Sequence, residues 1–566
     1  MAVMDLVSFL SGRYFEIPKY QRSYSWEKEN VRDMYEDIQE SIESGSPHYI
    51  GTFVLSGGKD FAFDLVDGQQ RLTTIFLLIK CIVDKLGKDD KAFYLRQFIE
   101  DPDRGLKLAL LGKDKEYFSN ILKNKNRKPT SKSQRLLDEA YKELSCFSKS
   151  LKKPKDFLKA IERLQVMEMV EHHRGEAVRI FQTVNDRGKP LTYMEKAKSL
   201  LAYYSSRYLD SALDDEINDA FGEVFESYDY IKETASSLRI NLITSNDFSE
   251  DNILRYHFFT FSKSNIDATP SYILSELKTK LHELKNKNGT KSIELKSFIE
   301  DYVSKLKAFS LGLKGLVGLA EKSSRYFKIF SILGISATLY PLMVTLHNMG
   351  LLEKKTETRG HLSYLDLIEL IDVRIYKVRQ TDPRAEILRF TYDLASGDKE
   401  KSEVEGWLLW YNKRWMSKDE FSTYMSSEVY GQKSLPLMFI DLCENIGKKK
   451  FKLSELKAMS VAKPTIEHVL ARDPEEFDTK SHGFKDDEDY FNHIHALGNL
   501  TILSGADNSS AGKKTPLQKV KIYDKSNYIM NAELATLINA NRRFHKGELK
   551  QRTKTMLDYI KKRWWC

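Results

Sequence analysis

The stretch TIEHVL at residues 465–470 places a carboxylate beside an imidazole, directly after two β-branched residues. Histidine titrates near neutral pH, so His468 could act as a base beside a phosphate. Glu467 could bind a metal ion at the same phosphate. They could equally be two polar residues that follow a strand. The residues downstream decide between these two interpretations.

The sequence ALGNLTILSGADNSSAGKKTP at 496–516 supplies the rest of the motif. NLTIL is strand-like, SGADN offers turn residues and a helix N-cap, and Asn499 and Asn508 are nine positions apart (508 − 499 = 9). This order resembles the ββα-metal unit of the HNH nuclease superfamily, in a His-Asn-Asn form. It departs from that pattern at Ala471, near which a proline often stands, and at Asn508, where histidine is common.

Phosphodiester hydrolysis accounts for these residue types. His468 would deprotonate the attacking water. Glu467 and Asn508 would offer oxygen ligands to a hard cation, Mg²⁺ or Mn²⁺, which neutralises charge at the scissile phosphate. Asn499 would brace the loop and orient His468 by hydrogen bonding.

Strand geometry limits this interpretation. Adjacent residues on a strand point to opposite faces, so Glu467 and His468 cannot both face inward on a flat strand, and the resemblance implies a local twist. Lys513 and Lys514 follow the turn and are expected to contact DNA phosphates. Three further histidines are interpreted as surface-loop residues: His482, His493 and His495.

Two strings near the N-terminus, FEIPKYQRSYSW (15–26) and DGQQRLTT (67–74), place donors around a helix start. An Asp-Gly pair suits a tight turn after a strand, and the first turn of a helix offers free N–H groups to a phosphate. Arg71 and Thr73 add side-chain donors there. Arg22 could reach the same anion through its two-pronged guanidinium.

A third string, IFQTVNDRGKPLTYMEKAKSLL (180–201), pairs an Asn-Asp-Arg-Gly turn with a helix. Asn185 and Arg187 could serve a nucleotide base, a phosphate or a metal. Each string alone is also explained by helix capping and ordinary salt bridges.

The three strings together resemble the N-terminal domain of GmrSD-type restriction endonucleases, which is related to the ParB and sulfiredoxin nucleotide-binding fold. The resemblance covers about 1–201 and 460–566 and implies an NTP-hydrolysing sensor, using GTP or ATP, fused to an HNH nuclease. No P-loop motif occurs in the sequence, so NTP use rests on the resemblance. The residues expected to bind nucleotide are Gln21, Arg22, Asp67, Gln69, Gln70, Arg71, Thr73, Asn185 and Arg187.

The elements that must position these residues can be predicted from local patterns. Residues 49–57 and 61–68 form a hairpin pattern, and 71–86 is a buried helix. We predict an α+β, mostly helical chain with three parts: a ParB/sulfiredoxin-like domain at 1–201, a helical middle region at 202–445 and a ββα-metal (HNH) nuclease domain at 446–566. The Lys-rich stretch 446–464 is interpreted as a solvated linker.

The composition sets the class. A chain of 566 residues is too long for one core. The basic excess (89 − 81 = 8) permits nucleic-acid binding without demonstrating it. Four dispersed cysteines without a CxxC pair favour a reducing cytoplasm over a zinc ribbon or a disulfide framework. We find neither a signal peptide nor an apolar run of roughly 18 residues, so no membrane span is expected.

These inferences predict a cytoplasmic anti-phage restriction endonuclease that cuts double-stranded DNA under NTP control. The target would carry a modification such as glucosylated hydroxymethylcytosine or a phosphorothioate, and a homodimer is compatible with the sequence. One alternative is a nuclease for ordinary DNA whose N-terminal domain only binds DNA. Another is a non-catalytic DNA-binding or scaffold protein with a decayed nuclease, against which the intact Glu-His and asparagine residues argue.

Overall fold

The computed structural model describes residues 2–18, 21, 23–57, 61–171, 191–244, 247–263, 265–286, 293–473 and 479–565. Helices make up 66% of the structure, which confirms the prediction of a mostly helical α+β chain. The chain divides into two compact units. The first contains Met1–Glu226 and Pro270–Ser304, and the second contains Ser227–Thr269 and Lys305–Cys566.

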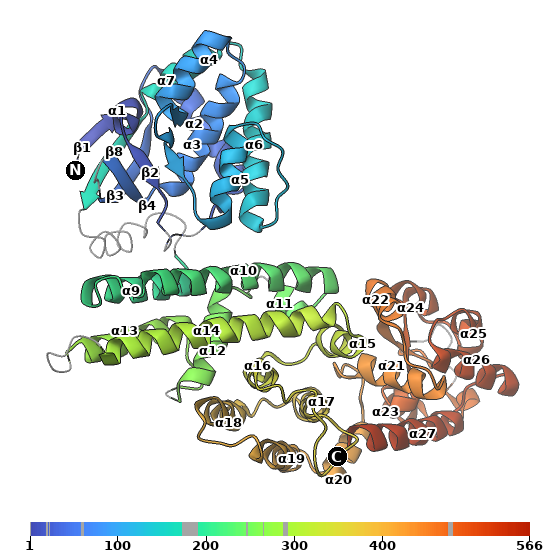
Figure 1. The fold of residues 1–566 in the computed structure, drawn as a ribbon. Helices are drawn as coiled ribbons and strands as arrows, with labels where there is room; N and C mark the ends of the chain where they lie inside the picture. Colours follow the sequence, from blue (N-terminus) through green and yellow to red (C-terminus); the bar gives the residue numbers. More distant parts are fainter. Residues whose placement is uncertain are drawn as a thin grey trace. The chain divides into compact units, whose positions relative to one another are not determined.

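A six-stranded mixed sheet lies at the centre of the first unit, in the order β1-β8-β3-β4-β2-β7 (Figure 1). The strands β3 and β4 pair antiparallel, so the predicted hairpin is confirmed. The strand β8 lies parallel to β3 on its other side. The bounds of the six strands are β1 (Ala2–Asp5), β2 (Tyr14–Glu16), β3 (Tyr49–Gly57), β4 (Ala62–Asp67), β7 (Leu108–Ala109) and β8 (Gln165–Glu171).

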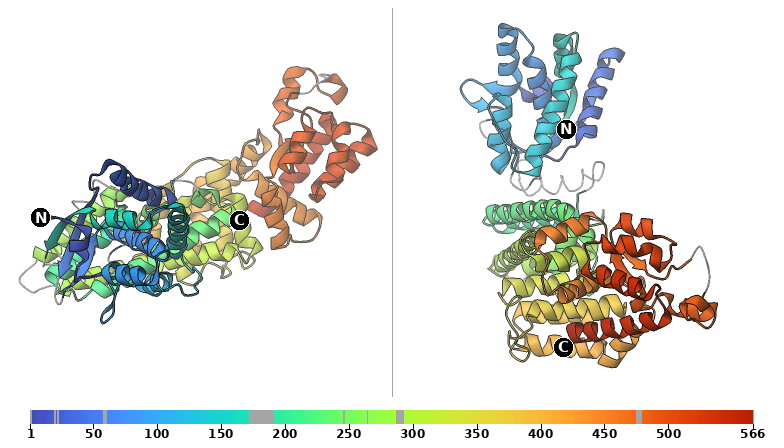
Figure 2. Two further views of the ribbon diagram at one scale, coloured as in Figure 1. Left: turned by 90° about the horizontal axis from the view of Figure 1, so that it is seen from above. Right: turned by 90° about the vertical axis from the view of Figure 1, so that its right-hand side faces the viewer.

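Helices pack alongside this sheet around one hydrophobic core (Figures 1 and 2). The central helix α3 (Gln69–Val83) is buried at every position except Arg71, which explains its continuous apolar sequence and confirms the predicted buried helix. It begins after Gly68, whose φ of 93° suits glycine. The other helices around this core include α1 (Leu6–Leu10), α2 (Lys28–Ser44), α4 (Lys88–Tyr94), α5 (Gly112–Leu122), α6 (Lys132–Ser150) and α7 (Pro154–Glu162). The unit also includes α9 (Tyr193–Tyr208) and α13 (Pro270–Asn286), whose described residues do not contribute to this core.

The second unit is largely helical, and the predicted helical middle region is confirmed. The unit boundaries fall inside α10 (Asp214–Leu238) and α14 (Ile293–Ala320). Its further helices up to the C-terminal elements include α12 (Glu250–Phe261), α15 (Ser324–Phe327), α16 (Tyr340–Asn348), α17 (Tyr364–Ile371), the π-helix η6 (Asp372–Val378), α18 (Arg384–Ser396), α19 (Glu403–Trp415), α20 (Lys418–Ser426) and α21 (Leu435–Ile446).

The C-terminal part of this unit contains two short antiparallel strands, β9 (Thr465–His468) and β10 (Leu500–Leu503). Helix α24 (Gly505–Ala511) follows β10 directly, which gives the predicted strand-strand-helix order. A separate hydrophobic core lies beneath these elements. The remaining elements are α23 (Asp487–Ile494), the 3-10 helix η8 (Leu497–Asn499), α25 (Pro516–Asp524), α26 (Ile529–Asn541) and α27 (Lys546–Trp564).

The stretch 446–464 contains a helix, α22 (Leu453–Val461), so its interpretation as a solvated linker is wrong. Leu456 is fully buried. Lys457 donates a hydrogen bond to the carbonyl oxygen of Glu321 at 3.2 Å, and Arg239 donates to the carbonyl oxygen of Ser460 at 3.0 Å. The apolar pair Leu456 and Met459 has helical spacing, which the surrounding lysines concealed.

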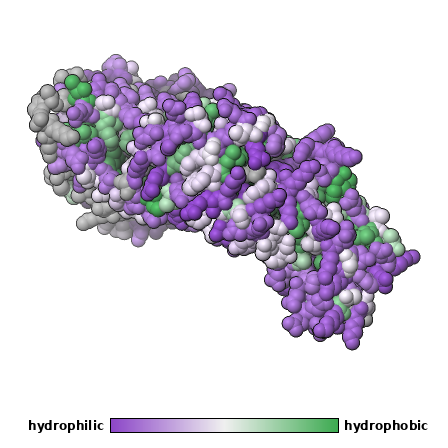
Figure 3. Space-filling model, turned by 90° about the horizontal axis from the view of Figure 1, so that it is seen from below, coloured by the Kyte–Doolittle hydropathy of each residue, from purple (hydrophilic) through white to green (hydrophobic). Residues whose placement is uncertain are grey.

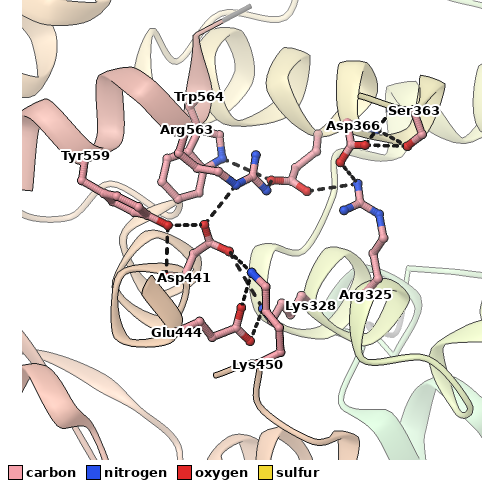
Figure 4. A network of polar contacts seen from close by, with 11 residues as sticks. Arg325, Lys328, Ser363, Asp366, Asp441, Glu444, Lys450, Tyr559, Arg563 and Trp564 are labelled. Atoms are coloured by element: carbon pink, nitrogen blue, oxygen red, sulfur yellow. Dashed lines mark hydrogen bonds and ion pairs between the residues drawn. The ribbon is translucent and has the colours of Figure 1, made fainter. Parts of the chain in front are cut away.

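A buried polar network fixes α27 to α17 and α21 (Figure 4). Arg563 donates to the Glu369 carboxylate at 2.7 Å and to Asp441 at 3.0 Å. Tyr559 donates to Asp441 at 2.8 Å, and the Trp564 indole donates to Glu369 at 3.2 Å. Because the guanidinium satisfies two carboxylates that are themselves buried, the end of α27 is tied to the helical region.

Hydrophilic side chains cover most of the molecular face drawn in Figure 3, and hydrophobic ones form small separate patches there. Within the described ranges, no helix combines the length and the apolar character needed to cross a membrane.

Gly498 tests how α27 positions the segment before β10. A Cβ at Gly498 would lie 2.2 Å from the carbonyl oxygen of Leu549 and 2.4 Å from the hydroxyl of Thr553. Gly498→Ala should therefore lower the free energy of unfolding by about 1–3 kcal/mol, as overpacking does. Gly547→Ala is the matched control, because that position faces open space at the start of α27. Urea denaturation that showed equal midpoints for the two variants would contradict this packing.

Candidate functional site

His468 lies at the end of β9 and is only 8% exposed. Its Nε2 is 3.0 Å from Nδ1 of His495, and the ring of Tyr430 packs over it with a centroid distance of 4.4 Å. Burial, together with His495, Lys519 and Arg472, lowers the pKa of His468 to about 4. The ring is therefore neutral near pH 7, which is the form that a general base requires.

The prediction that His495 is an incidental surface histidine is wrong. The ring of His495 contacts both His468 and Tyr430, and it stacks on Tyr430 with an interplanar angle of 14°. The two other histidines bond elsewhere: His482 with the carbonyl oxygen of Phe544, and His493 with that of Asp489. Sequence alone gave no signal that distinguished the three, since His495 reaches His468 across 27 positions.

Glu467 contacts a lysine that the sequence did not single out. Its carboxylate lies 2.7 Å from Nζ of Lys519, on α25, and both side chains are almost completely buried. Lys519 also donates to the carbonyl oxygen of His468 at 2.7 Å. Burial raises the pKa of Glu467 and lowers that of Lys519, while their ion pair opposes both shifts.

Asn499 is fully buried and holds the backbone around the two histidines. Its Nδ2 donates to the carbonyl oxygens of Leu470 at 3.1 Å and Ile494 at 2.8 Å, and its Oδ1 accepts from the Leu470 N–H at 2.8 Å. The side chain thus braces the loop after His468, as predicted from the residue types. It orients His468 through the backbone, since its side-chain bonds go to neighbouring residues.

Asn508, on α24, donates from Nδ2 to the hydroxyl of Thr465 at 2.6 Å. Thr465 and Glu467 alternate with Ile466 along β9 and therefore share one face. The two residues predicted as metal ligands thus lie on the same face of the strand. The imidazole of His468, at the last residue of β9, contacts Tyr430 and His495.

These two donors fit a hard cation in their chemistry. They offer one carboxylate and one amide oxygen, and Mg²⁺ commonly completes its shell with water and substrate phosphate. The described part of the chain contains no cluster of three His, Cys, Asp or Glu side chains that could hold a metal. A cation at Glu467 would have to share the carboxylate with Lys519.

Lys513 and Lys514 lie on the surface beyond α24. Lys513 forms an ion pair with Asp473, in which both side chains are mostly exposed. Lys514 donates to the carbonyl oxygen of Ser510. The exposed Lys513–Asp473 pair is weak, and the contact of both lysines with DNA phosphates stays a prediction.

In the first unit, Arg71 is committed to the sheet. Its guanidinium donates to the carbonyl oxygens of Ile50 at 2.9 Å and Thr52 at 2.7 Å, and it lies 3.6 Å from the Asp67 carboxylate. A Cβ at Gly51 would lie 1.7 Å from this guanidinium, so only glycine leaves it room. Arg71 therefore braces β3 in this structure, and its contact with a phosphate stays a prediction.

The glutamines of the DGQQR string hold the segment that follows residue 20. Gln69 donates to Gln21 at 3.1 Å, and Gln70 accepts from the backbone N–H of Ser25 at 2.9 Å. Together they border a small hollow, whose lining residues are Ile17, Ser23, Tyr24, Gln69, Gln70, Thr73, Leu110, Leu111 and Asp114.

Asp114 is the acidic group of this hollow, and sequence reasoning missed it. Its side chain is 6% exposed and hydrogen-bonds with Ser133, Gln134 and Ser23. Burial raises its pKa in spite of these bonds. Its string, GKDKEYF, carries no recognisable motif, so only the fold brings it to α3.

The structure thus gathers Gln21, Gln69, Gln70 and Thr73 at one place, while Asp67 and Arg71 lie against β3. The remaining predicted nucleotide-binding residues, Arg22, Asn185 and Arg187, lie outside the described residues.

Two family models match the chain. The N-terminal domain of the GmrSD restriction endonuclease matches residues 5–202, and the C-terminal domain of GmrSD restriction endonucleases matches residues 415–559. The second match starts before the boundary predicted at 446 and so includes Tyr430. No curated protein matches the chain.

The fold and the two matches define a restriction endonuclease, an enzyme whose substrate is DNA. The chain belongs to the GmrSD-type family of these enzymes, and the resemblance noted in its motifs is confirmed.

The Glu467–Lys519 pair yields a test of stability. Lys519→Met leaves a buried carboxylate without its cation and should lower the free energy of unfolding by about 3–5 kcal/mol. The double variant Glu467→Gln, Lys519→Met should recover much of this loss. Lys513→Met, which removes an exposed lysine, should leave the urea midpoint nearly unchanged. A double variant no more stable than Lys519→Met alone would contradict the pairing.

Proposed function

We propose that this enzyme protects its host by hydrolysing phosphodiester bonds of invading DNA at an HNH-type centre built on His468. The observation that carries the proposal is a buried, neutral histidine at the end of β9, braced by Asn499 within a strand-strand-helix unit. Its neutral form and its position at the end of β9 suit a general base.

In this mechanism, His468 takes a proton from water as the water oxygen attacks phosphorus. Asn499 keeps the loop after β9 in place, and Lys513 and Lys514 hold neighbouring phosphates of the strand. Glu467 and Asn508 would hold a Mg²⁺ or Mn²⁺ ion, which when bound neutralises charge on the scissile phosphate and the leaving oxygen.

We further propose that the first unit controls cleavage through a bound GTP or ATP and directs it to modified DNA. The support is the polar hollow at the start of α3, where Gln69, Gln70 and Thr73 meet the buried Asp114. A helix start of this kind favours phosphate.

One observation favours a second candidate for the first unit. Because the Arg71 guanidinium is already satisfied by two strand carbonyl oxygens, the motif could be a structural brace. The N-terminal domain would then only bind DNA, and the nuclease would act on ordinary DNA without a nucleotide.

Replacing the base tests the nuclease assignment. His468→Ala should slow plasmid cleavage by on the order of a hundred- to ten-thousandfold, because the attacking water loses its proton acceptor. DNA affinity should persist, since it arises mainly from phosphate contacts elsewhere. His482→Ala is the control, because that ring bonds to Phe544 away from β9. Cleavage at the normal rate by His468→Ala would refute the assignment.

Two variants test nucleotide control. Thr73→Val removes a hydroxyl from the hollow while keeping the side-chain shape, and Arg71→Ala removes the guanidinium. A lost charge-assisted contact of about 1.5–3 kcal/mol should reduce GTP or ATP hydrolysis by roughly ten- to a hundredfold. Arg104→Ala, at an exposed position of the same unit, should hydrolyse normally.

Circular dichroism must show that these variants fold, because Arg71 also braces β3. Folded Thr73→Val and Arg71→Ala with normal hydrolysis would rule out the nucleotide site. If neither the unsubstituted enzyme nor any variant hydrolyses GTP or ATP, but DNA is still cut, the DNA-binding alternative is supported.

A further inference from the structure

The hydrogen bond between His468 and His495 can be donated by either ring, but by only one of them at a time. Nε2 of His468 and Nδ1 of His495 are 3.0 Å apart, and two neutral imidazoles can share a hydrogen bond only if one nitrogen donates and the other accepts. There are two arrangements. Either His468 donates through Nε2–H, or His495 donates through Nδ1–H.

His495 is held firmly enough to fix this contact. Its carbonyl oxygen accepts from the N–H of Val429 at 3.1 Å, and the neighbouring residues Glu428 and Ala496 form a β-bridge. Asn499 holds the preceding residue, Ile494, by its carbonyl oxygen. Tyr430 packs on both imidazole rings. Backbone bonds before and after His495 therefore fix its main chain, and Tyr430 fixes its ring.

We propose that His495 is a positioning residue that accepts the Nε2–H of His468 and so leaves the lone pair on Nδ1 for the attacking water. The inference rests on the proposed function of His468 as the base. Within the described residues, Nδ1 of His468 has no hydrogen-bond partner, so it is the nitrogen open to substrate. If His495 donated instead, the single ring proton of neutral His468 would lie on its own Nδ1. That nitrogen could then not accept a proton from water.

The proposed step conserves atoms and charge. An O–H bond of water breaks and its proton goes to Nδ1 of His468, while the water oxygen forms a bond to phosphorus. The ester P–O bond breaks, its electron pair leaves with the departing oxygen, and that oxygen takes a proton from solvent. His468 becomes an imidazolium, so its Nε2–H bond to His495 becomes charge-assisted and stronger. An interaction that strengthens as the reaction proceeds accelerates it.

Two substitutions separate acceptance of the proton from packing of the ring. His495→Phe keeps an aromatic ring against Tyr430 but has no acceptor. His495→Asn places an amide oxygen near the position of Nδ1. We expect His495→Phe to lower kcat by on the order of a hundredfold, near the lower limit for loss of a general base, with unchanged affinity for DNA. His495→Asn should remain within a few-fold of the unsubstituted enzyme.

Equal loss in both variants, or none in His495→Phe, would overturn the inference. ¹⁵N NMR of the imidazole nitrogens gives a readout that does not require cleavage. His468 should be in the Nε2–H tautomer in the full-length enzyme and in His495→Asn, and should become a mixture of tautomers in His495→Phe. An Nδ1–H tautomer in the unsubstituted enzyme would also overturn it.

Assaying His468→Ala in parallel distinguishes this inference from the proposed function. If His468→Ala cuts DNA as fast as the unsubstituted enzyme, the function assigned to His468 fails. If it does not cut and His495→Phe cuts normally, only the role of His495 fails.

Discussion

The candidate site depends on the hydrogen bonds of one fully buried amide, that of Asn499. It bonds to both backbone groups of Leu470 and to the carbonyl oxygen of Ile494. These bonds join the chain that leaves β9 to the chain that precedes β10, and so bring His468 and His495 together. The arrangement needs a donor and an acceptor on one short side chain. An amide provides both, whereas an ionised carboxylate could only accept.

The neighbouring residue, Glu467, is in a different environment because the strand alternates. Its carboxylate turns toward α25, where Lys519 both neutralises it and bonds to the carbonyl oxygen of His468. A buried ion pair adds little net stability compared with an apolar pair, but removing one partner is costly. Its contribution here is therefore to geometry: it holds the end of β9, and with it the backbone of His468, at a fixed position.

The elements of this fold follow from local sequence, while their contacts do not. β-Branched and aromatic residues on both sides of a turn string predicted the hairpin at 49–57 and 61–68, and the NLTIL and SGADN patterns predicted β10 and α24. Local pattern failed at 446–464, where lysines outnumber Leu456 and Met459, the two residues of α22 that are buried. Lys519 was not singled out, and His495 was assigned to the surface, because each meets its partner from a distant position. Such partners are selected by tertiary packing, which a local pattern does not contain.

The C-terminal functional unit begins before residue 446, the boundary predicted from the sequence. The segment between α20 and α21 pairs with the backbone at His495 and places Tyr430 over both histidines. Helices α20 and α21 also contact α27 and, in the case of α21, both strands. Tyr430 is 44% exposed, so one part of its ring covers the base while another faces solvent beside it. The exposed part of the Tyr430 ring therefore lies beside any substrate that reaches His468. The family match begins at residue 415, well before β9. This agrees with a site that is complete only with the residues that precede that strand.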